Sequence, residues 1–233
     1  MRLVDTVPDF LKPILRPIYY ATYWKYKKMI CHPRSCSELH QYWRQPCDGY
    51  NLPEHFLKQK ERSLFLVKKV KEYVPLNAKI LEIGCNIGRN LSFLFRAGFE
   101  NLAGVEISEK AVKLLKQYHP KMAYHAKIYN MPIEEKIRAF RDCEFDIVFT
   151  MAVLEHIHTD SKWIFSEMAR ITKGFLITIE DEHNVSWRHF TRNYKKVFES
   201  IGMKQIEEIN CREVCKLCNY VARVFKRESF FYM

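Results

Sequence analysis

The chain has 233 residues, 48% of them hydrophobic, which is enough for one ordinary core and excludes a disordered or low-complexity chain. Its 38 Lys and Arg outnumber its 27 Asp and Glu, and the formal net charge of +11 leaves acidic substrates, anionic membrane surfaces and nucleic acid open as partners. No apolar run is long enough for a membrane span, the first residues do not resemble a signal peptide, and the eight scattered cysteines are typical of reduced thiols in the cytoplasm.

The composition divides the chain near residue 56. Residues 1–56 hold six of the nine prolines and many aromatic side chains, and we expect an N-terminal helical and aromatic extension there. Its first 30 residues mix basic and aromatic side chains, which suits either a lid over a cleft or a segment on an anionic membrane surface. If the extension is a lid, Tyr42-Trp43-Arg44 and residues 51–56 help to form the acceptor pocket. Residues 57–233 are expected to form the main domain.

The main domain alternates between strand and helix patterns. Apolar runs predict strands at 79–83, 102–106, 122–126, 145–150, 175–180, 204–210 and 220–225. Helical spacing predicts helices at 57–73, 90–97, 109–118, 133–140, 161–171 and 187–200. This alternation indicates βαβ crossovers, and the two final strands, with no helix between them, are expected to pair as an antiparallel edge hairpin. The predicted fold class is α/β, a doubly wound, Rossmann-like and mostly parallel sheet of seven strands.

The turn after the first strand is rich in residues that permit unusual backbone angles. Gly84 allows a tight turn, and the helix that follows offers free N–H groups to a ligand. The dinucleotide fingerprint G-x-G-x-x-G requires glycine where this chain has Asn86 and Arg89, so a pyrophosphate cofactor is disfavoured. Asn tolerates a left-handed backbone, so we expect Asn86 to preserve the shape of the loop.

The spacing Gly84-x-x-x-Gly88, with Glu82 two residues earlier, resembles motif I of the class I S-adenosylmethionine (SAM)-dependent methyltransferases. Glu106 ends the second strand, where an acidic residue accepts hydrogen bonds from ribose hydroxyls. The segment 145–157 resembles the fourth motif of the family, and the whole resemblance covers residues 60–226. It implies SAM as the cofactor. The residues that it implies for the cofactor site are Glu82, Gly84, Cys85, Asn86, Gly88, Glu106, Ile107, Asn130, Met131 and Met151.

Two clusters of acidic and histidine residues follow the fourth and fifth strands, at the sheet edge where open α/β sheets bind ligands. Methyl transfer requires an aligned acceptor and often the removal of its proton. His156 has the ordinary pKa of a general base near neutrality, with a capping or core role as its alternative. For the second cluster the alternative is a solvated loop. The predicted catalytic residues are His156, Glu180, Asp181 and His183.

We expect no metal ion in the site. Some quinone-precursor O-methyltransferases of similar fold hold a divalent ion with Glu-Val-x-Glu-His, but this chain has Ala152 in place of the first carboxylate. The triplet Cys211-x-x-x-Cys215-x-x-Cys218 has the spacing of radical-SAM cluster ligands, yet its place between the last two strands favours ordinary hairpin cysteines. A zinc site there would need a fourth ligand from the extension, such as Cys31, His32 or Cys36.

These patterns predict an enzyme that transfers a methyl group from SAM to a small molecule, preferably to a hydroxyl of a saccharide or secondary metabolite. A nucleic-acid methyltransferase is one alternative, but the fourth strand lacks the Asn/Asp-Pro-Pro-aromatic signature of enzymes that methylate amino groups of nucleic acids. A metal- or iron–sulfur-binding module that uses the cysteine triplet is the other. The expected location is cytoplasmic, with peripheral membrane contact through residues 1–30 as an option.

Overall fold

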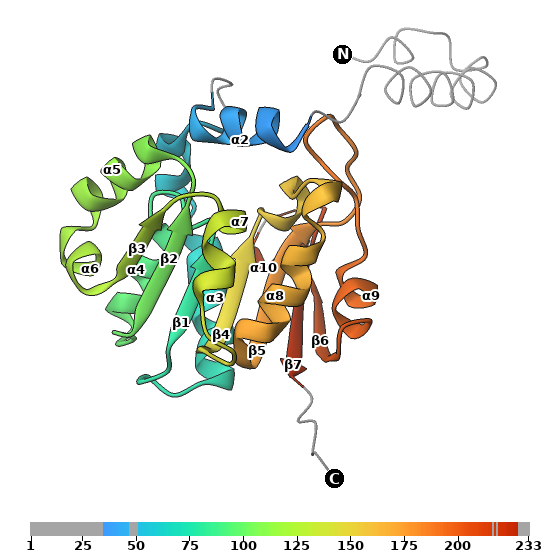
Figure 1. Ribbon diagram of the computed structural model, residues 1–233. Coiled ribbons are helices and arrows are strands. Elements are labelled where there is room, and N and C mark those ends of the chain that lie inside the picture. Colours follow the sequence, from blue (N-terminus) through green and yellow to red (C-terminus); the bar gives the residue numbers. More distant parts are fainter. Residues whose placement is uncertain (1–34, 47–50, 216, 218, 228–233) are drawn as a thin grey trace, which may run out of the picture.

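The computed structural model describes residues 35–46, 51–215, 217 and 219–227, without the side chains of Glu213 and Cys215 (Figure 1). Their core is a seven-stranded sheet in the order β3-β2-β1-β4-β5-β7-β6. Its strands are β1 (Ile80–Ile83), β2 (Leu102–Glu106), β3 (Lys127–Asn130), β4 (Phe145–Met151), β5 (Thr172–Asp181), β6 (Met203–Asn210) and β7 (Tyr220–Arg227). The predicted fold class is confirmed.

Strands β1 to β5 run parallel, and β7 runs antiparallel to both of its neighbours, β5 and β6. The strand order reverses between β1 and β4, and open α/β sheets bind their ligands beyond the carboxyl ends of the strands at such a point. The two final strands pair as predicted. Of the two, β6 is an edge strand of the sheet, whereas β7 lies between β5 and β6. A short helix, α10 (Cys211–Cys215), connects β6 to β7 in place of a simple turn.

Helices cover both faces of the sheet (Figure 1). The main helices are α3 (Lys60–Tyr73), α4 (Arg89–Arg96), α5 (Glu109–Tyr118), α6 (Pro120–His125), α7 (Ile133–Lys136), α8 (Trp163–Ile171) and α9 (Tyr194–Glu199). Short 3-10 helices are η4 (Pro53–Lys58), η5 (Ile137–Ala139), η6 (Leu154–His156) and η7 (Thr159–Ser161).

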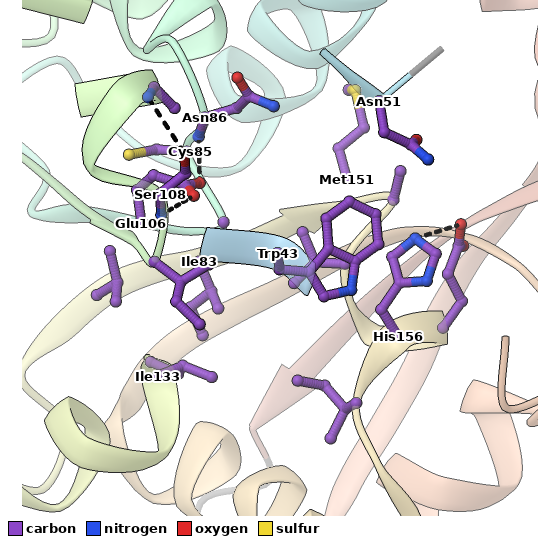
Figure 2. A pocket seen from close by; sticks show the side chains of 18 of the residues that line it. Trp43, Asn51, Ile83, Cys85, Asn86, Glu106, Ser108, Ile133, Met151 and His156 are labelled. Carbon is purple, nitrogen blue, oxygen red and sulfur yellow. Dashed lines mark hydrogen bonds and ion pairs between the residues drawn. The ribbon is translucent and has the colours of Figure 1, made fainter. Parts of the chain in front are cut away.

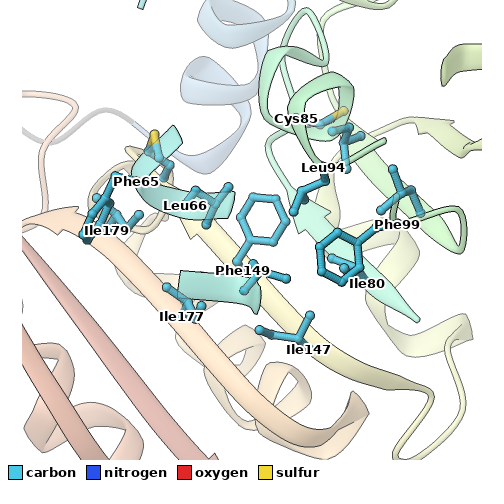
Figure 3. Packing of buried hydrophobic residues seen from close by; sticks show 14 of the residues in the cluster. Phe65, Leu66, Ile80, Cys85, Leu94, Phe99, Ile147, Phe149, Ile177 and Ile179 are labelled. Carbon is cyan, nitrogen blue, oxygen red and sulfur yellow. The ribbon is translucent and has the colours of Figure 1, made fainter. Parts of the chain in front are cut away.

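Alternate residues of the buried strands supply two separate hydrophobic clusters, one on each face. On one face Ile80 and Phe149 pack with Leu66 of α3 and Leu94 of α4 (Figure 3). On the other face Leu81 and Val148 pack with residues of α8 and α9. Because both faces are covered, strands β1 and β4 are almost continuously apolar, as the sequence pattern predicted.

Helix α2 (Cys36–Arg44) lies across the carboxyl ends of the central strands (Figure 1). A capping box starts it: the Ser35 side chain accepts from the Glu38 backbone N–H, and the Glu38 carboxylate accepts from the Ser35 backbone N–H. This helix and the start of η4 belong to the described part of the N-terminal extension. The first 34 residues, with the predicted membrane-surface segment, lie outside the described residues. None of the described helices has the length and apolar character to cross a membrane.

Two predicted elements are wrong. The segment 122–126 was predicted as a strand, but Pro120 begins helix α6 instead, and β3 starts at Lys127, where it pairs with Ala103 of β2. Proline fits the first helical position because that residue needs no N–H partner within the helix. The predicted helix 187–200 is helical only from Tyr194 to Glu199. Asn193 caps that helix by accepting from the Lys196 N–H, and the residues before it form a loop over the sheet edge.

Candidate active site

A cavity of about 480 Å³ lies between the carboxyl ends of the central strands and helix α2. Its size is typical of sites that bind cofactors and small molecules. Nine of the residues predicted for the site line it: Glu82, Gly84, Cys85, Asn86, Glu106, Ile107, Met131, Met151 and His156. Five do not line it: Gly88, Asn130, Glu180, Asp181 and His183. Helix α2 and the segment after it contribute Leu39, Trp43, Asn51 and Phe56, among others.

Three residues of the loop between β1 and α4 have a left-handed backbone: Gly84 (φ 74°), Asn86 (φ 48°) and Gly88 (φ 71°). The expectation that Asn86 adopts a left-handed backbone is confirmed. Gly88 acts through packing rather than through the cavity, because a Cβ there would lie 2.6 Å from Leu115 Cγ and 2.9 Å from Met122 Cε. Because Gly84 and Gly88 have no side chain, the loop backbone can pass close to the cavity at Gly84 and close to Leu115 and Met122 at Gly88.

Glu106, at the end of β2, holds this loop in place. Its Oε2 accepts from the backbone N–H of Asn86 at 2.8 Å, and its Oε1 accepts from that of Ser108 at 2.7 Å (Figure 2). Burial raises the pKa of Glu106, against the lowering effect of these backbone donors. A carboxylate has about four acceptor positions, and the backbone of Ile107 also donates to this one, so acceptor capacity for a hydroxyl group in the cavity still remains. Asn130 lies behind Glu106, where its side chain donates to the Glu106 carbonyl at 2.8 Å.

Glu82, within β1, presents a buried carboxylate with an unsatisfied oxygen. Its Oε1 accepts from Asn90 Nδ2 at 2.8 Å, whereas its Oε2 has no hydrogen-bond partner among the described residues. Burial raises the pKa of Glu82 to about 8. A buried acceptor without a partner is costly, so this oxygen is suited to a cationic or donor group of a ligand in the cavity.

Arg89 is a site residue that the sequence analysis did not identify. It lies in the first turn of α4, is 7% exposed and lines the cavity. Its guanidinium donates to Ser63 Oγ, to the Phe56 carbonyl and to Gln59 Oε1, at 2.9 to 3.0 Å. Arg89 therefore fastens the segment before β1 to the loop after it. A signal was present, since a cation at a helix N-terminus opposes the helix dipole and calls for another partner.

His156 lies at the opposite end of the cavity from Glu106, in η6 beneath the Trp43 ring, whose centroid is 4.4 Å from that of the imidazole (Figure 2). Its Nδ1 is 2.8 Å from the Arg188 carbonyl oxygen. Because a carbonyl only accepts, we assign the proton of the neutral ring to Nδ1 and the lone pair to Nε2. Burial lowers the pKa of His156 to about 3, with the neighbouring His189 as a lesser cause.

Glu155 lies beside this histidine and is itself 1% exposed on its side chain. Its Oε1 accepts from Tyr220 OH at 2.8 Å and lies 3.6 Å from His156 Nε2 and 3.9 Å from His189 Nε2. Its Oε2 accepts from the Asp181 backbone N–H at 2.5 Å. Burial raises the pKa of Glu155 to about 7. The side chains of Glu155, His156 and His189 thus form a compact cluster of ionisable groups against the cavity.

The second predicted cluster, after β5, has a different environment. Glu180 is fully buried, and its Oε2 accepts from the backbone N–H groups of Val153 and Leu154, both at 2.9 Å. Asp181 Oδ1 accepts from the backbone N–H of His183 at 2.8 Å. Both carboxylates hold loops, and the His183 side chain is exposed to solvent. Their positions give no support to the predicted catalytic roles of Glu180, Asp181 and His183.

The model of the methyltransferase domain family matches residues 81–177, which include β1, the glycine loop, Glu106 and the Glu155-His156 pair. Residues 81–177 of this chain therefore carry a methyltransferase domain. A mouse (Mus musculus) eEF1A lysine and N-terminal methyltransferase is 23% identical over 117 residues, which are 47% of this chain but only 16% of that protein. The match therefore spans a small part of that relative's length.

Two solved structures have the same fold as this methyltransferase. Geranyl diphosphate methyltransferase in complex with GPP and sinefungin is 10% identical, with a TM-score of 0.67 over 82% of this chain and 98% of that one. Magnesium protoporphyrin IX methyltransferase from Synechocystis PCC 6803 with bound SAM is 18% identical, with a TM-score of 0.59 over 82% and 96% of the two chains. SAM is the cofactor of the domain.

The cavity has the polar groups that this cofactor requires. The amino group of SAM is a cation, and the buried Glu82 Oε2 is an acceptor that no described residue satisfies. The ribose of SAM carries two hydroxyls, and Glu106 has acceptor capacity left beyond its backbone donors. Between them the loop from Gly84 to Asn86 brings backbone to the cavity wall. The residues present therefore fit the cofactor.

Two groups of described residues each offer three potential metal-ligand atoms within 4.8 Å of one another: Glu155, His156 and His189, and Cys36, His40 and Glu134. In the first group Glu155 already accepts hydrogen bonds at both carboxylate oxygens. The cysteine triplet is not assembled within the described residues, because Cys218 lies outside them. Cys211 is fully buried at the start of α10.

Proposed function

We propose that this methyltransferase transfers the methyl group of SAM to a hydroxyl oxygen of a small-molecule acceptor, such as a saccharide or secondary metabolite. The neutral imidazole of His156, with Nε2 unprotonated beside the cavity, is the observation that carries the proposal. A hydroxyl attacks as an oxygen nucleophile only if it loses its proton during the reaction, so it needs a base. An amine can lose its proton to water beforehand and needs none.

Binding and alignment are the first task of the protein. Glu82 would hold the amino group of the cofactor and Glu106 its ribose, while the loop from Gly84 to Asn86 supports the chain between them. When bound, SAM supplies an electrophilic methyl group on a sulfonium. Because the donor is already reactive, the contribution of the protein is to fix the acceptor in line and to keep water out. Arg89 keeps the walls of this site together.

Proton removal is the second task, and because burial lowers the pKa of His156 to about 3, the imidazole needs an anionic neighbour to stabilise its protonated form. The Arg188 carbonyl fixes the ring so that Nε2 carries the lone pair. When Nε2 takes the acceptor's proton, the imidazolium lies 3.6 Å from Glu155 Oε1, which stabilises it if that carboxyl is ionised. Tyr220 fixes the same oxygen through its hydroxyl. Glu155 and Tyr220 therefore act as positioning residues, and His156 acts on the acceptor.

The position of helix α2 favours a small-molecule acceptor over a macromolecular one. It covers the cavity from above, and its Trp43 ring packs against His156 (Figure 2). The Trp43 Nε1 is buried and has no hydrogen-bond partner among the described residues, so it can donate to an oxygen of the acceptor. An aromatic face with a few placed polar groups is typical of sites for small molecules.

A protein acceptor is the competing function, since the curated relative is named as a lysine and N-terminal methyltransferase. The two are separated by incubating the purified chain with SAM and with matched pairs of acceptors, phenols against anilines and saccharides against amino sugars, and with lysine-containing proteins. S-adenosylhomocysteine release is measured, and mass spectrometry locates the methyl group. We expect methyl ethers from the hydroxyl compounds. Methylation restricted to amines or to protein lysines would refute O-methylation of small molecules.

A further inference from the structure

A second group of side chains lies at the edge of the cavity, away from His156. Cys36 and His40 are one turn apart on helix α2, so their side chains share a face of that helix. Glu134 of α7 comes up from the segment that follows β3. The Cys36 Sγ to His40 Nε2 distance is 3.6 Å, and the His40 Nε2 to Glu134 Oε1 distance is 3.1 Å. All three ligand atoms lie within 4.8 Å of one another.

The Cys36–His40 separation of 3.6 Å matches that between the ligands of a zinc ion, and the His40–Glu134 separation of 3.1 Å is slightly shorter. With bonds of about 2.3 Å to sulfur and about 2.0–2.1 Å to nitrogen or oxygen, a tetrahedral zinc holds its ligand atoms roughly 3.3–3.6 Å apart. Thiolate, imidazole and carboxylate are the three protein ligands that zinc accepts. In the Glu155 cluster the carboxylate lies 3.6 Å from one imidazole and 3.9 Å from the other, and both carboxylate oxygens already accept hydrogen bonds.

The surroundings also fit a bound cation. Ser161 Oγ lies 3.6 Å from Cys36 Sγ, and a hydrogen bond from Ser161 orients the Glu134 carboxylate. The three ligand residues are all half-buried, which leaves a path for the ion. An ion pair between His40 and Glu134 would account for two of these groups, whereas a bound ion accounts for all three, including the thiol 3.6 Å from the same imidazole nitrogen.

We propose that Cys36, His40 and Glu134 bind one Zn²⁺ ion that fastens helix α2 to the segment after β3. The three ligands leave a fourth position for water, as in zinc sites that are not closed. The ion links helix α2 to helix α7 on another side of the cavity, so it orders the helix that carries Trp43. The three residues line the same cavity, but none of them has a role in the proposed methyl transfer, so the metal site does not depend on the acceptor or on O-methylation.

The test uses the full chain, stripped of metal with a chelator under reducing conditions, and titrates it with Co²⁺ and then with Zn²⁺. We expect one equivalent of Co²⁺ to produce a thiolate-to-cobalt charge-transfer band in the near ultraviolet, and Zn²⁺ to remove it. Zinc should also slow amide hydrogen exchange in peptides that cover Cys36–Arg44. The absence of the charge-transfer band in the unaltered chain would overturn the proposal.

Variants identify the ligands. Cys36→Ser should abolish the charge-transfer band and weaken zinc binding by more than roughly 100-fold, beyond the loss expected from a residue that only orients a ligand. His40→Cys supplies a second thiolate and should keep the metal with a stronger band, which separates ligation from packing. The matched control replaces Cys211, Cys215 and Cys218 with Ser and should retain the band. A band that survives in Cys36→Ser, or disappears in the triple variant, would refute the site.

Discussion

Asn90 donates a 2.8 Å hydrogen bond to one carboxylate oxygen of Glu82 and leaves the other oxygen buried without a partner among the described residues. This arrangement holds the Glu82 side chain in one orientation before any ligand arrives. It also makes the charged form of Glu82 costly in the free protein, because burial outweighs the stabilising charge of Arg89 and the second oxygen has no hydrogen-bond partner among the described residues. The consequence is a dependence of stability on pH and a dependence of cofactor binding on protonation.

The folded pKa of Glu82 is raised from 4.5 to about 8, so the native state holds this proton more tightly than the unfolded chain. The stabilisation is complete below pH 4.5 and is lost as the pH rises through about 8, with a total of roughly 3–5 kcal/mol. Glu82→Gln should remove this pH dependence and unfold at a higher temperature than the unaltered chain at pH 8. Scanning calorimetry from pH 5 to pH 9 measures the difference. Parallel curves for the two proteins would show that Glu82 is ionised throughout.

SAM binding should release a proton from Glu82 near pH 7, since a cationic amino group beside the carboxylate lowers its pKa. Calorimetric titrations of the same protein in buffers with different ionisation enthalpies report this release directly. In Glu82→Gln we expect weaker binding with no such release. Proton release of equal size in the variant would mean that another group gives up the proton.

Glu106→Ala should weaken SAM binding by roughly 1–3 kcal/mol, because the ribose hydroxyls lose a buried acceptor and the loop at Asn86 loses its anchor. Asn130→Ala is the matched control: that side chain bonds the Glu106 backbone and does not line the cavity, so its effect should be smaller. Titration calorimetry measures both. Unchanged affinity in Glu106→Ala would remove Glu106 from the cofactor site.

Arg223 of β7 binds Glu182 with two hydrogen bonds, Nε to Oε1 at 2.7 Å and a terminal nitrogen to Oε2 at 2.9 Å. The two residues are 4% and 9% exposed, so Arg223→Met should cost about 3–5 kcal/mol by leaving a buried carboxylate unpaired. The exposed pair of Lys113 and Glu109 is the control, and Lys113→Met should leave the free energy of unfolding nearly unchanged. Urea unfolding monitored by circular dichroism compares them. Equal costs would contradict the importance of burial.

Local backbone requirements explain what the sequence predicted well. Gly84, Asn86 and Gly88 adopt a left-handed backbone, and glycine and asparagine are residue types that tolerate it. The buried strands are nearly continuous apolar runs, which also made them predictable. The segment after Pro120 was wrongly predicted as a strand, because proline can either end one helix or begin the next, and here it begins α6. The choice depends on where the next strand pairs with β2, which is a contact between distant parts of the chain.

The residues of the site that the sequence did not reveal come from such distant contacts. His189 reaches Glu155 because the loop before α9 is held to η6: the Phe190 N–H donates to the Glu155 carbonyl, and Arg192 donates to the carbonyls of Leu154 and Ile157. These bonds prevent the helix that the pattern at 187–200 predicted. Likewise, no sequence pattern connects Cys36 and His40 with Glu134, because only the fold brings α2 above α7.

His156→Ala should reduce turnover by about 10²–10⁴-fold and leave SAM affinity nearly unchanged, because the base is lost while the groups at Glu82 and Glu106 remain. His183→Ala is the control: its side chain is exposed and does not line the cavity, so turnover should stay within a few-fold. Steady-state rates with an accepted hydroxyl compound, together with calorimetry, separate the two effects. If His156→Ala retains turnover within a few-fold, alignment alone drives the reaction.

The dependence of the turnover rate on pH is a second test of His156 as the base. With a pKa lowered to about 3, His156 is unprotonated across the working range and should contribute no rise in rate near its ordinary pKa of 6.5. Glu155, with its pKa raised to about 7, becomes an anion as the pH passes that value and then stabilises the imidazolium. The rate should therefore rise through about pH 7 in the unaltered protein. Glu155→Gln should be slower and flat over this range, whereas a rise that persists in Glu155→Gln would assign the titration to another group.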